Sequence, residues 1–391
     1  MGALAQKDLD FLDAIETPPP EIPIAQSPRP EPILRPVMPE LDTIRGLAIL
    51  GVLFYHEFYN RAAIVALPHW QQTLALFAWP GRLGVNLFFV LSGFLITGIL
   101  LEARGEKSYY KRFYIRRALR ILPAYTAVLL ILAAVGYPTS FVLLSLVYLT
   151  NFVNLFGVPF AYLILWSLAV EEHFYMVWPL VVRKLSMVNL ERVVIGIIVL
   201  SPLARLISFR HSTPNDLNWM FYTWNNADGL ACGALLALFV RRTHGDRRRL
   251  YRACLIATSL AAALWAIGWR FGIMFRDRSL GAALQVTPFQ FLFFAVVGIF
   301  LLVGTTRWKW LVLWRPLRFL GYISYGLYLI HELVFNAFDR LQNHAHLFEP
   351  GYGAFTVLMA RFFCATSAAI LLAWLSRKYF ENLFLRMKPK T

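Results

Sequence analysis

Long apolar runs separated by short polar or basic segments dominate the chain from residue 43 to residue 376. Their length is close to the ~20 residues that an α-helix needs to cross the hydrocarbon core of a bilayer. The pattern predicts an all-α integral membrane protein with about ten transmembrane helices, near residues 43–62, 83–101, 121–137, 163–182, 193–208, 219–240, 252–271, 285–304, 317–339 and 354–376.

The distribution of basic residues indicates whether one further apolar stretch, residues 141–157, crosses the membrane. Loops rich in Lys and Arg collect on the cytoplasmic side of membrane proteins. The basic segments YYKRFYIRRALR, RKLSMVNLER, RRTHGDRRRLYR and RWKWLVLWRPLR, with the basic C-terminal tail, share that side only if residues 141–157 do not cross. We therefore predict a re-entrant or outer-face segment there, both termini in the cytoplasm, and a bacterial inner membrane location.

The first 40 residues differ from the rest of the chain. The stretch ETPPPEIPIAQSPRPEPILRPVMPE is proline-rich and acidic and shows no hydrophobic period, so it predicts a disordered cytoplasmic tail. It has no apolar core of a secretory signal peptide, and the first span is expected to act as an uncleaved signal. The expected division is a tail at 1–40, a membrane domain at 41–386 and a cytoplasmic end at 387–391.

Composition agrees with lipid as the solvent, since 58% of the residues are hydrophobic and the mean hydropathy is +0.56. The net charge of +16 comes from short clusters between apolar runs, which argues against nucleic acid as a partner. The three cysteines lack the spacing of metal ligands or disulfides. No P-loop, Rossmann glycine pattern, H-E-x-x-H or haem motif appears, so we expect no metal and no permanently bound cofactor.

Arg45 and His56 are the most informative polar residues of the first span, with ten residues between them. On an α-helix this spacing places both side chains on one face, about 16 Å apart along the axis, which is half of a ~30 Å hydrocarbon core. An imidazole near the midplane is a functional-site hypothesis by default. The alternative is a structural histidine that is hydrogen-bonded to a neighbouring helix.

The fourth span carries Glu171, Glu172 and His173 in succession within ILWSLAVEEHFYMVWPL. Adjacent side chains on a helix point about 100° apart, so the two glutamates cannot serve one function equally. Glu171 shares a face with Ser167 and Tyr175. The pattern predicts a carboxylate that orients or charges an imidazole, without identifying which one; the alternative is hydrogen bonding between helices.

A cationic segment, SYYKRFYIRRALRILPAY, precedes the third span and is expected to form a short interfacial helix. Arg117 and Arg120 form an Arg-x-x-Arg pair, and Arg112 and Arg116 extend the cluster at four-residue spacing. One interpretation is an anchor for lipid headgroups. The other is a cytoplasmic phosphate clamp, since guanidinium groups offer planar bidentate donors. Asp228, a carboxylate within another apolar span, is expected to have an internal partner. His331 is expected to face the helix bundle or the outer surface.

The ordered motifs resemble the membrane acyltransferase-3 family from about Leu41 to Arg386. The motifs that carry the resemblance are LDTIRGLAILGVLFYH, GVNLFFVLSGFLITGILL, FYIRRALRILPAY, WSLAVEEHFYMVWP, ADGLACGALLA and LGYISYGLYLIH, with YFENLFLRMK at the end. The resemblance implies a ten-helix domain, an acyl-CoA donor (acetyl-CoA is expected) that arrives from the cytoplasm, and a carbohydrate acceptor in the cell envelope.

The family's Arg-x10-His motif falls on Arg45 and His56, and its Arg-x-x-Arg motif on Arg117 and Arg120. Its W-S-L-x-x-E-E-x-F-Y motif runs from Trp166 to Tyr175. This chain departs from the family at Asn86, where many members have Asp, and at His173, where many have Gln. An amide cannot act as a base, so Asn86 leaves the list of acid–base candidates.

The resemblance implies acyl transfer from acyl-CoA to a sugar hydroxyl, and these residues suit that reaction. His56 would be the general base or a transient acyl carrier, with Glu171 or Glu172 as its carboxylate partner. Arg45, Arg117 and Arg120 would hold the CoA phosphates, while Ser167, Trp166, Tyr175, Asp228 and His331 would support the substrate. The alternatives are acylation of a small glycosylated metabolite such as a macrolide sugar, a secondary transporter, and a non-catalytic export partner.

Overall fold

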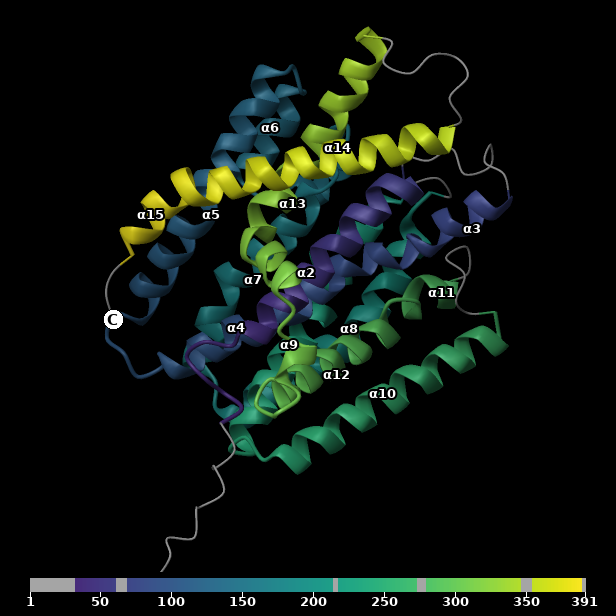
Figure 1. The fold of residues 1–391 in the computed structure, drawn as a ribbon. Helices are drawn as coiled ribbons and strands as arrows, with labels where there is room; N and C mark the ends of the chain where they lie inside the picture. The colour runs from purple at the N-terminus through teal and green to yellow at the C-terminus, as the bar shows by residue number, and fades with distance from the viewer. Residues whose placement is uncertain (1–31, 61–68, 214–216, 273–278, 346–353, 389–391) are drawn as a thin grey trace, which may run out of the picture. The chain divides into compact units, whose positions relative to one another are not determined.

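The computed structural model describes residues 32–60, 69–213, 217–272, 279–345 and 354–388, and every regular element in these ranges is a helix (Figure 1). The predicted all-α class is confirmed for this part of the chain. The main helices are α2 (Pro39–Phe54), α3 (His69–Phe77), α4 (Gly84–Glu102), α5 (Tyr109–Ala134), α7 (Leu165–Lys184), α8 (Met187–His211), α9 (Thr223–Arg242), α10 (Arg247–Arg270), α11 (Ser279–Leu284), α12 (Thr287–Val303), α13 (Arg315–Ala345) and α14 (Ala354–Leu375).

Six helical stretches of the described chain are long and apolar enough to cross a membrane, which makes this a multi-pass membrane protein. They are Trp79–Glu102, Tyr109–Ala134, Met187–His211, Arg247–Arg270, Ser279–Val303 and Thr356–Arg386. The other four predicted spans coincide with the helices α2, α7, α9 and α13. The total of ten spans stays a prediction.

The stretch 141–157 contains no single long helix. It is divided between α6 (Thr139–Leu146) and the 3₁₀ helix η4 (Thr150–Phe156), of eight and seven residues. Gly157 ends η4 with a left-handed backbone at φ 65°. Each piece is far shorter than the ~20 residues of a spanning helix. The location of this segment at the outer face stays a prediction.

The cationic segment before the third span is part of that span. The expected short interfacial helix is wrong, because α5 runs without a break through Pro123. Neighbouring groups can support a backbone that a proline interrupts in membrane helices. The Tyr325 hydroxyl donates to the Ile121 carbonyl at 2.8 Å, which joins α5 to α13 close to the proline.

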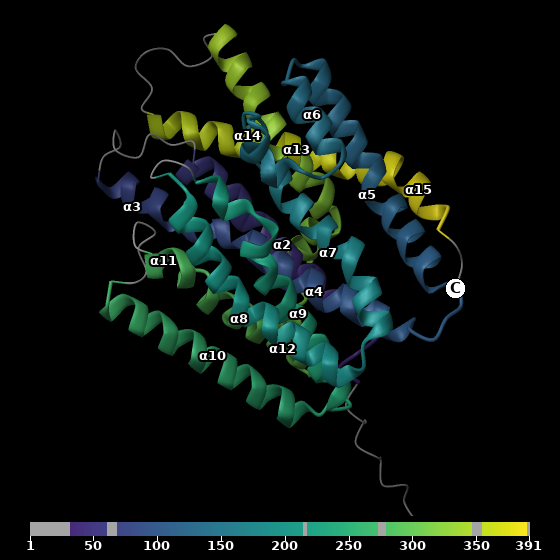
Figure 2. The ribbon, with the colours of Figure 1, turned by 180° about the vertical axis from the view of Figure 1, so that it is seen from behind.

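Helices α2 and α13 are packed unusually closely, and this contact builds the site described below. A Cβ atom on Gly46 would lie 1.9 Å from the Leu317 carbonyl oxygen, and one on Gly321 would lie 1.8 Å from that of Asp42. Small residues allow such backbone contact between membrane helices. Figures 1 and 2 show α2 and α13 together at the centre, with α8 beside α9 and α10 beside α12.

The basic loops gather at one end of the helices. Arg242 pairs with Glu191 at 2.6 Å, which joins the end of α9 to the first turns of α8. The Arg247 guanidinium donates to the Leu302 carbonyl at 2.8 Å, and Arg241 pairs with Glu102. This grouping agrees with the expected positive side, although which side of the membrane it faces stays a prediction.

The packed part of the chain begins at Ile33 rather than at residue 41. The Ile33 side chain is buried, and Arg35 pairs with the buried carboxylate of Glu40. Arg35 also donates to the Gly304 carbonyl at 3.1 Å. Residues 33–40 therefore belong to the helical domain, while the predicted tail at 1–31 lies outside the described residues.

Candidate active site

His56 lies on a π-helical turn, η1 (Tyr55–Asn60), that continues α2. Single π turns within helices occur frequently at functional sites. The next residue, Glu57, is fully buried and accepts hydrogen bonds from the Arg361 Nε at 2.7 and 2.9 Å. Arg361 also pairs with Asp339 at 2.6 Å. This network fixes the π turn against α13 and α14 and so fixes the position of the imidazole.

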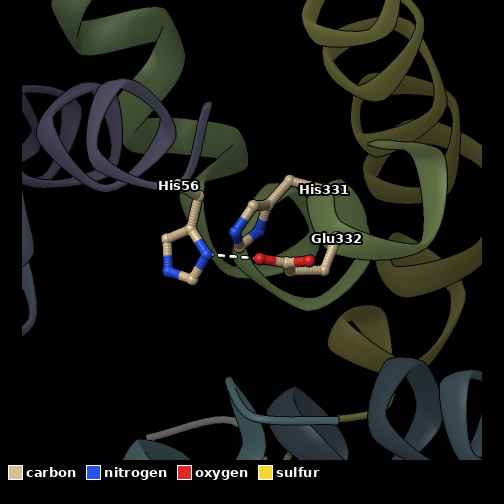
Figure 3. A group of neighbouring side chains, drawn as sticks. All are labelled: His56, His331 and Glu332. Atoms are coloured by element: carbon tan, nitrogen blue, oxygen red, sulfur yellow. Dashed lines mark hydrogen bonds and ion pairs between the residues drawn. The ribbon is translucent and has the colours of Figure 1, made fainter. Parts of the chain in front are cut away.

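His56 pairs with Glu332, which α13 contributes (Figure 3). The bond joins the imidazole Nδ1 to a carboxylate oxygen, and both side chains are largely buried. An ionised carboxylate only accepts hydrogen bonds, so it holds the proton of the neutral ring on Nδ1. The Nε2 atom then carries the lone pair, as a general base requires.

His331 completes the group in Figure 3. Its ring meets that of His56 edge-on, with centroids 5.1 Å apart. The His331 Nδ1 donates to the Tyr328 carbonyl at 2.8 Å, and its buried Nε2 has no hydrogen-bond partner among the described residues. The sequence placed His331 in the bundle or at the outer face, and the structure places it fully inside.

The structure corrects the predicted carboxylate partner of His56, because Glu171 and Glu172 belong to a different group. Glu171 accepts hydrogen bonds from the Ser92 hydroxyl at 2.9 Å and from the Tyr175 hydroxyl at 2.7 Å. Glu172 lies 3.9 Å from the Arg117 guanidinium. Both glutamates lie on α7 within 4 Å of Arg117 of α5, whereas His56 lies on η1 and pairs with Glu332 of α13.

The predicted phosphate-binding arginines share one cavity of about 210 Å³, and Glu171, Glu172 and Tyr175 line it with them. The Arg117 guanidinium lies 3.5 Å above the Tyr175 ring, and α2 contributes Arg45. Arg120 makes no ion pair with any described carboxylate. We call this space the arginine cavity. Arg45 is paired with Asp42, and Arg117 lies within 4 Å of both glutamates. The unpaired Arg120 guanidinium therefore suits an anionic ligand.

Lys388 adds charge next to the arginine cavity. Burial, together with the positive charges of Arg120, Arg377, Arg116 and Arg117, lowers the pKa of Lys388 to about 8. Burial is the main cause of this shift, and the nearby guanidinium groups add to it. An anion bound close to Lys388 would favour its charged ammonium form.

A second cavity of about 170 Å³ contains His56, and we call it the histidine cavity. Val85 and Tyr328 line both cavities. The Tyr328 hydroxyl lies 2.6 Å from the Ser167 hydroxyl and donates to the Ile164 carbonyl at 3.1 Å. Ser167, predicted to support the substrate, therefore lies at the partition between the two cavities.

The two remaining predicted support residues have separate positions. Trp166 lines the histidine cavity. Asp228 has the internal partner that the sequence predicted, a buried ion pair with Arg205 at 2.9 Å. Arg205 also donates to Thr287 and to two backbone carbonyls, so Asp228 stabilises a wall residue of the histidine cavity.

Sequence reasoning missed Glu332, although the rule that selected His56 applies to it. Glu332 follows His331 inside an apolar helix, and an ionisable residue at that depth is a functional hypothesis. The ligand atoms of His56, His331 and Glu332 lie within 4.8 Å of one another, close enough for one metal ion, whereas the sequence predicted no metal.

Comparison with known proteins gives the family. A Bacillus subtilis protein named "Putative peptidoglycan O-acetyltransferase YrhL" is 32% identical over 75% of this chain and 48% of its own length. Peptidoglycan O-acetyltransferase OatA of Listeria monocytogenes is 28% identical over 76% of this chain and 49% of its own length. The chain thus spans about half the length of these relatives.

No solved structure matches the chain. The model of the acyltransferase-3 family, described as an acyltransferase domain, matches residues 38–378. This interval includes the histidine cavity and, apart from Lys388, the charged groups of the arginine cavity. The chain therefore belongs to the acyltransferase-3 family of membrane acyltransferases.

Proposed function

We propose that this protein is an integral membrane O-acyltransferase that moves an acetyl group from cytoplasmic acetyl-CoA to a hydroxyl group of a cell-envelope carbohydrate. The observation that carries the proposal is the pair of adjoining cavities along α2. One is lined by Arg45, Arg117 and Arg120, and the other is lined by His56, which pairs with Glu332. The named activity of the relatives agrees with O-acetyl transfer.

The arginine cavity suits the phosphate-bearing part of the donor. Arginine binds phosphate through parallel N–H donors, and this cavity has more cations than carboxylates. The basic loops lie at one end of the helices, which we assign to the cytoplasm together with both termini. The pantetheine arm would then bring the thioester past Tyr328 toward His56, over the ~16 Å that separates Arg45 from His56 along a helix.

The His56–Glu332 pair suits the chemical step. A sugar hydroxyl attacks the thioester carbonyl carbon while the His56 Nε2 takes its proton, and the Glu332 carboxylate stabilises the resulting imidazolium. The C–S bond then breaks, and the CoA sulfur leaves with the proton that His56 returns. Acyl transfer through an acetyl-imidazole on His56 uses the same atoms in two steps.

The function is tested with the purified protein in proteoliposomes, radiolabelled acetyl-CoA, and envelope glycans from a deletion strain as acceptors. Wild type should label the glycan and release CoA. His56→Ala should abolish transfer while expression and membrane insertion stay normal. His211→Ala, at the exposed end of α8, is the matched control and should stay active. Full activity of His56→Ala would remove the imidazole from the mechanism.

Labelling without an acceptor separates the two chemical routes. A covalent acetyl group on His56, detected by mass spectrometry after brief incubation with acetyl-CoA, would identify the two-step route. Wild type that consumes acetyl-CoA only when glycan is present, with no labelled protein, would identify direct transfer. Absence of any acetyl transfer from acetyl-CoA to envelope carbohydrate would contradict the proposed function itself.

A further inference from the structure

The histidine cavity contains a cation that the acyl-transfer step does not use. Arg82 lines it from the 3₁₀ turn η3 (Trp79–Leu83). No described carboxylate pairs with Arg82, and its Nε is buried without a hydrogen-bond partner. A partly buried guanidinium that lacks a counter-charge is costly. An anionic ligand in the cavity would offset that cost.

The backbone fixes Arg82 close to the helix end that bears His56. A Cβ atom on Gly81 would lie 2.0 Å from the Gly51 carbonyl oxygen, so η3 lies directly against α2. The Arg82 guanidinium lies 4.1 Å above the Trp79 ring, which limits the directions that its side chain can take. This arrangement holds a positive charge at the wall of the cavity before any ligand enters.

Asn86 follows Arg82 by one helical turn and lines the same cavity. Its side chain makes no hydrogen bond with the described residues and is partly exposed. An amide can both donate to and accept from a hydroxyl group. An aspartate at this position would lie four residues from Arg82 and would neutralise it. The asparagine therefore leaves the guanidinium available for a ligand.

The remaining wall of the histidine cavity suits a sugar ring. Flat aromatic side chains cover apolar C–H faces, and a few amides supply hydrogen bonds, as is usual for specific small-ligand sites. The aromatic wall residues are Tyr55, Trp166, Trp219, Phe221 and Tyr328, and the amides are Asn86, Asn225, Asn226 and Gln285. The amide nitrogens of Asn225 and Asn226 donate to backbone carbonyls, so Asn86 is the amide that has no hydrogen bond within the described chain. The lining thus combines a stacking surface, hydrogen-bonding groups, one available cation and the base His56.

We infer that the histidine cavity is the acceptor subsite and that it selects a sugar that carries a carboxylate close to the acetylated hydroxyl. Arg82 binds the carboxylate and Asn86 binds a neighbouring hydroxyl, while His56 faces the hydroxyl that reacts. The inference rests on the proposed function, because it assigns the acceptor of that reaction. It makes Arg82 and Asn86 specificity-determining residues.

The test compares two forms of one acceptor. Envelope glycan from the deletion strain is used as isolated and after its carboxyl groups are reduced to alcohols with carbodiimide and borohydride. Wild type should show a kcat/KM about ten- to a hundredfold lower for the reduced glycan, the range expected for loss of a charge-assisted hydrogen bond. Arg82→Met should raise KM for the native glycan and make the two forms equal.

Three further variants test whether the preference depends on Arg82 and Asn86. Arg82→Lys keeps the charge and should restore part of the preference. Asn86→Asp should lower use of the native glycan, because the new carboxylate pairs with Arg82. Arg210→Met removes an exposed arginine at the end of α8 and should change nothing. CoA affinity measured on each variant confirms that the protein is folded.

The outcomes separate this inference from the proposed function. Equal use of native and reduced glycan by wild type would overturn the carboxylate preference, although acetyl transfer would stand. An equal fall in kcat for both glycans in Arg82→Met, with KM unchanged, would also overturn it, since Arg82 would then act on the transferred group. If wild type transfers nothing, direct binding of the two glycans is measured on wild type and on Arg82→Met. The inference is supported if wild type binds native glycan more tightly than reduced glycan and Arg82→Met does not. Equal binding of the two glycans to wild type overturns it.

Discussion

The arginine cavity and the histidine cavity lie along the same helix and share Val85 and Tyr328, but their charged groups differ in kind. The arginine cavity has several guanidinium groups around two glutamates, which suits electrostatic binding of an anion. The histidine cavity is lined by one imidazole, His56, and its pairing with the Glu332 carboxylate suits proton transfer. Arg82 is the lining cation that has no carboxylate partner among the described residues. The groups that bind the donor are therefore separate from the groups that react. Substitutions in one cavity should leave the function of the other cavity intact.

The largest expected effect is on the chemical step. Glu332→Gln removes the negative charge that stabilises the His56 imidazolium, and kcat for acetyl transfer should fall about 10²- to 10⁴-fold. CoA affinity, measured by calorimetry, should stay the same because Glu332 is absent from the lining of the arginine cavity. Glu191→Gln, in the first turns of α8 and paired with Arg242, is the control. A Glu332→Gln enzyme with wild-type kcat would show that the pair is structural.

A smaller effect is expected on donor binding. Arg117→Ala and Arg120→Ala should each weaken CoA binding about ten- to a hundredfold, since each removes a charge-assisted bond to phosphate. Lysine at either position should restore only part of the affinity. Arg112→Ala, earlier on α5 and paired with Glu106 at 2.6 Å, should bind CoA normally. Unchanged affinity in both arginine variants would reduce this segment to a membrane anchor.

The effect of pH on donor binding should be smaller than the effect of the arginine substitutions. The pKa of Lys388 is lowered to about 8, so its ammonium group is charged below that pH and loses its proton above it. Anion binding favours the charged form, so affinity for desulfo-CoA should fall by up to about tenfold between pH 8 and 9. Lys388→Met should bind more weakly at pH 7 and should lose this pH dependence. A steep fall that persists in Lys388→Met would assign the titration to another group.

The smallest effect is expected for Ser167, which lies at the partition between the arginine cavity and the histidine cavity. Ser167→Ala removes the contact with the Tyr328 hydroxyl and should lower the free energy of unfolding by about 1 kcal/mol. Acetyl transfer should change less than in Glu332→Gln, because the Tyr328 hydroxyl keeps its bond to the Ile164 carbonyl. Thermal unfolding in detergent and the transfer assay measure the two effects. Loss of activity as complete as in His56→Ala would place Ser167 in the chemistry.

The hydrophobic period and the positions of the charged residues predicted those features of the structure that are local in sequence. The apolar runs predicted the helices, and the spacing of Arg117 and Arg120 predicted a shared cationic face, which the structure shows in one cavity. The carboxylate partner of His56 could not be predicted in this way. It depends on how α2 and α13 meet, and that contact is decided by backbone approach at Gly46 and Gly321, 275 residues apart in the chain. Glu171 and Glu172 stand out in the sequence as ionisable residues within an apolar span, which says nothing of their distance from His56.

The most direct test of the central claim measures CoA affinity and acetyl transfer on the same preparations of His56→Ala and Arg120→Ala. The two-cavity account predicts that His56→Ala binds CoA like wild type but transfers no acetyl group. It predicts that Arg120→Ala binds CoA about ten- to a hundredfold more weakly and recovers most of its transfer rate at saturating acetyl-CoA. If both variants lose affinity and transfer rate to the same extent, donor binding and chemistry are not divided between the two cavities, and the account is wrong.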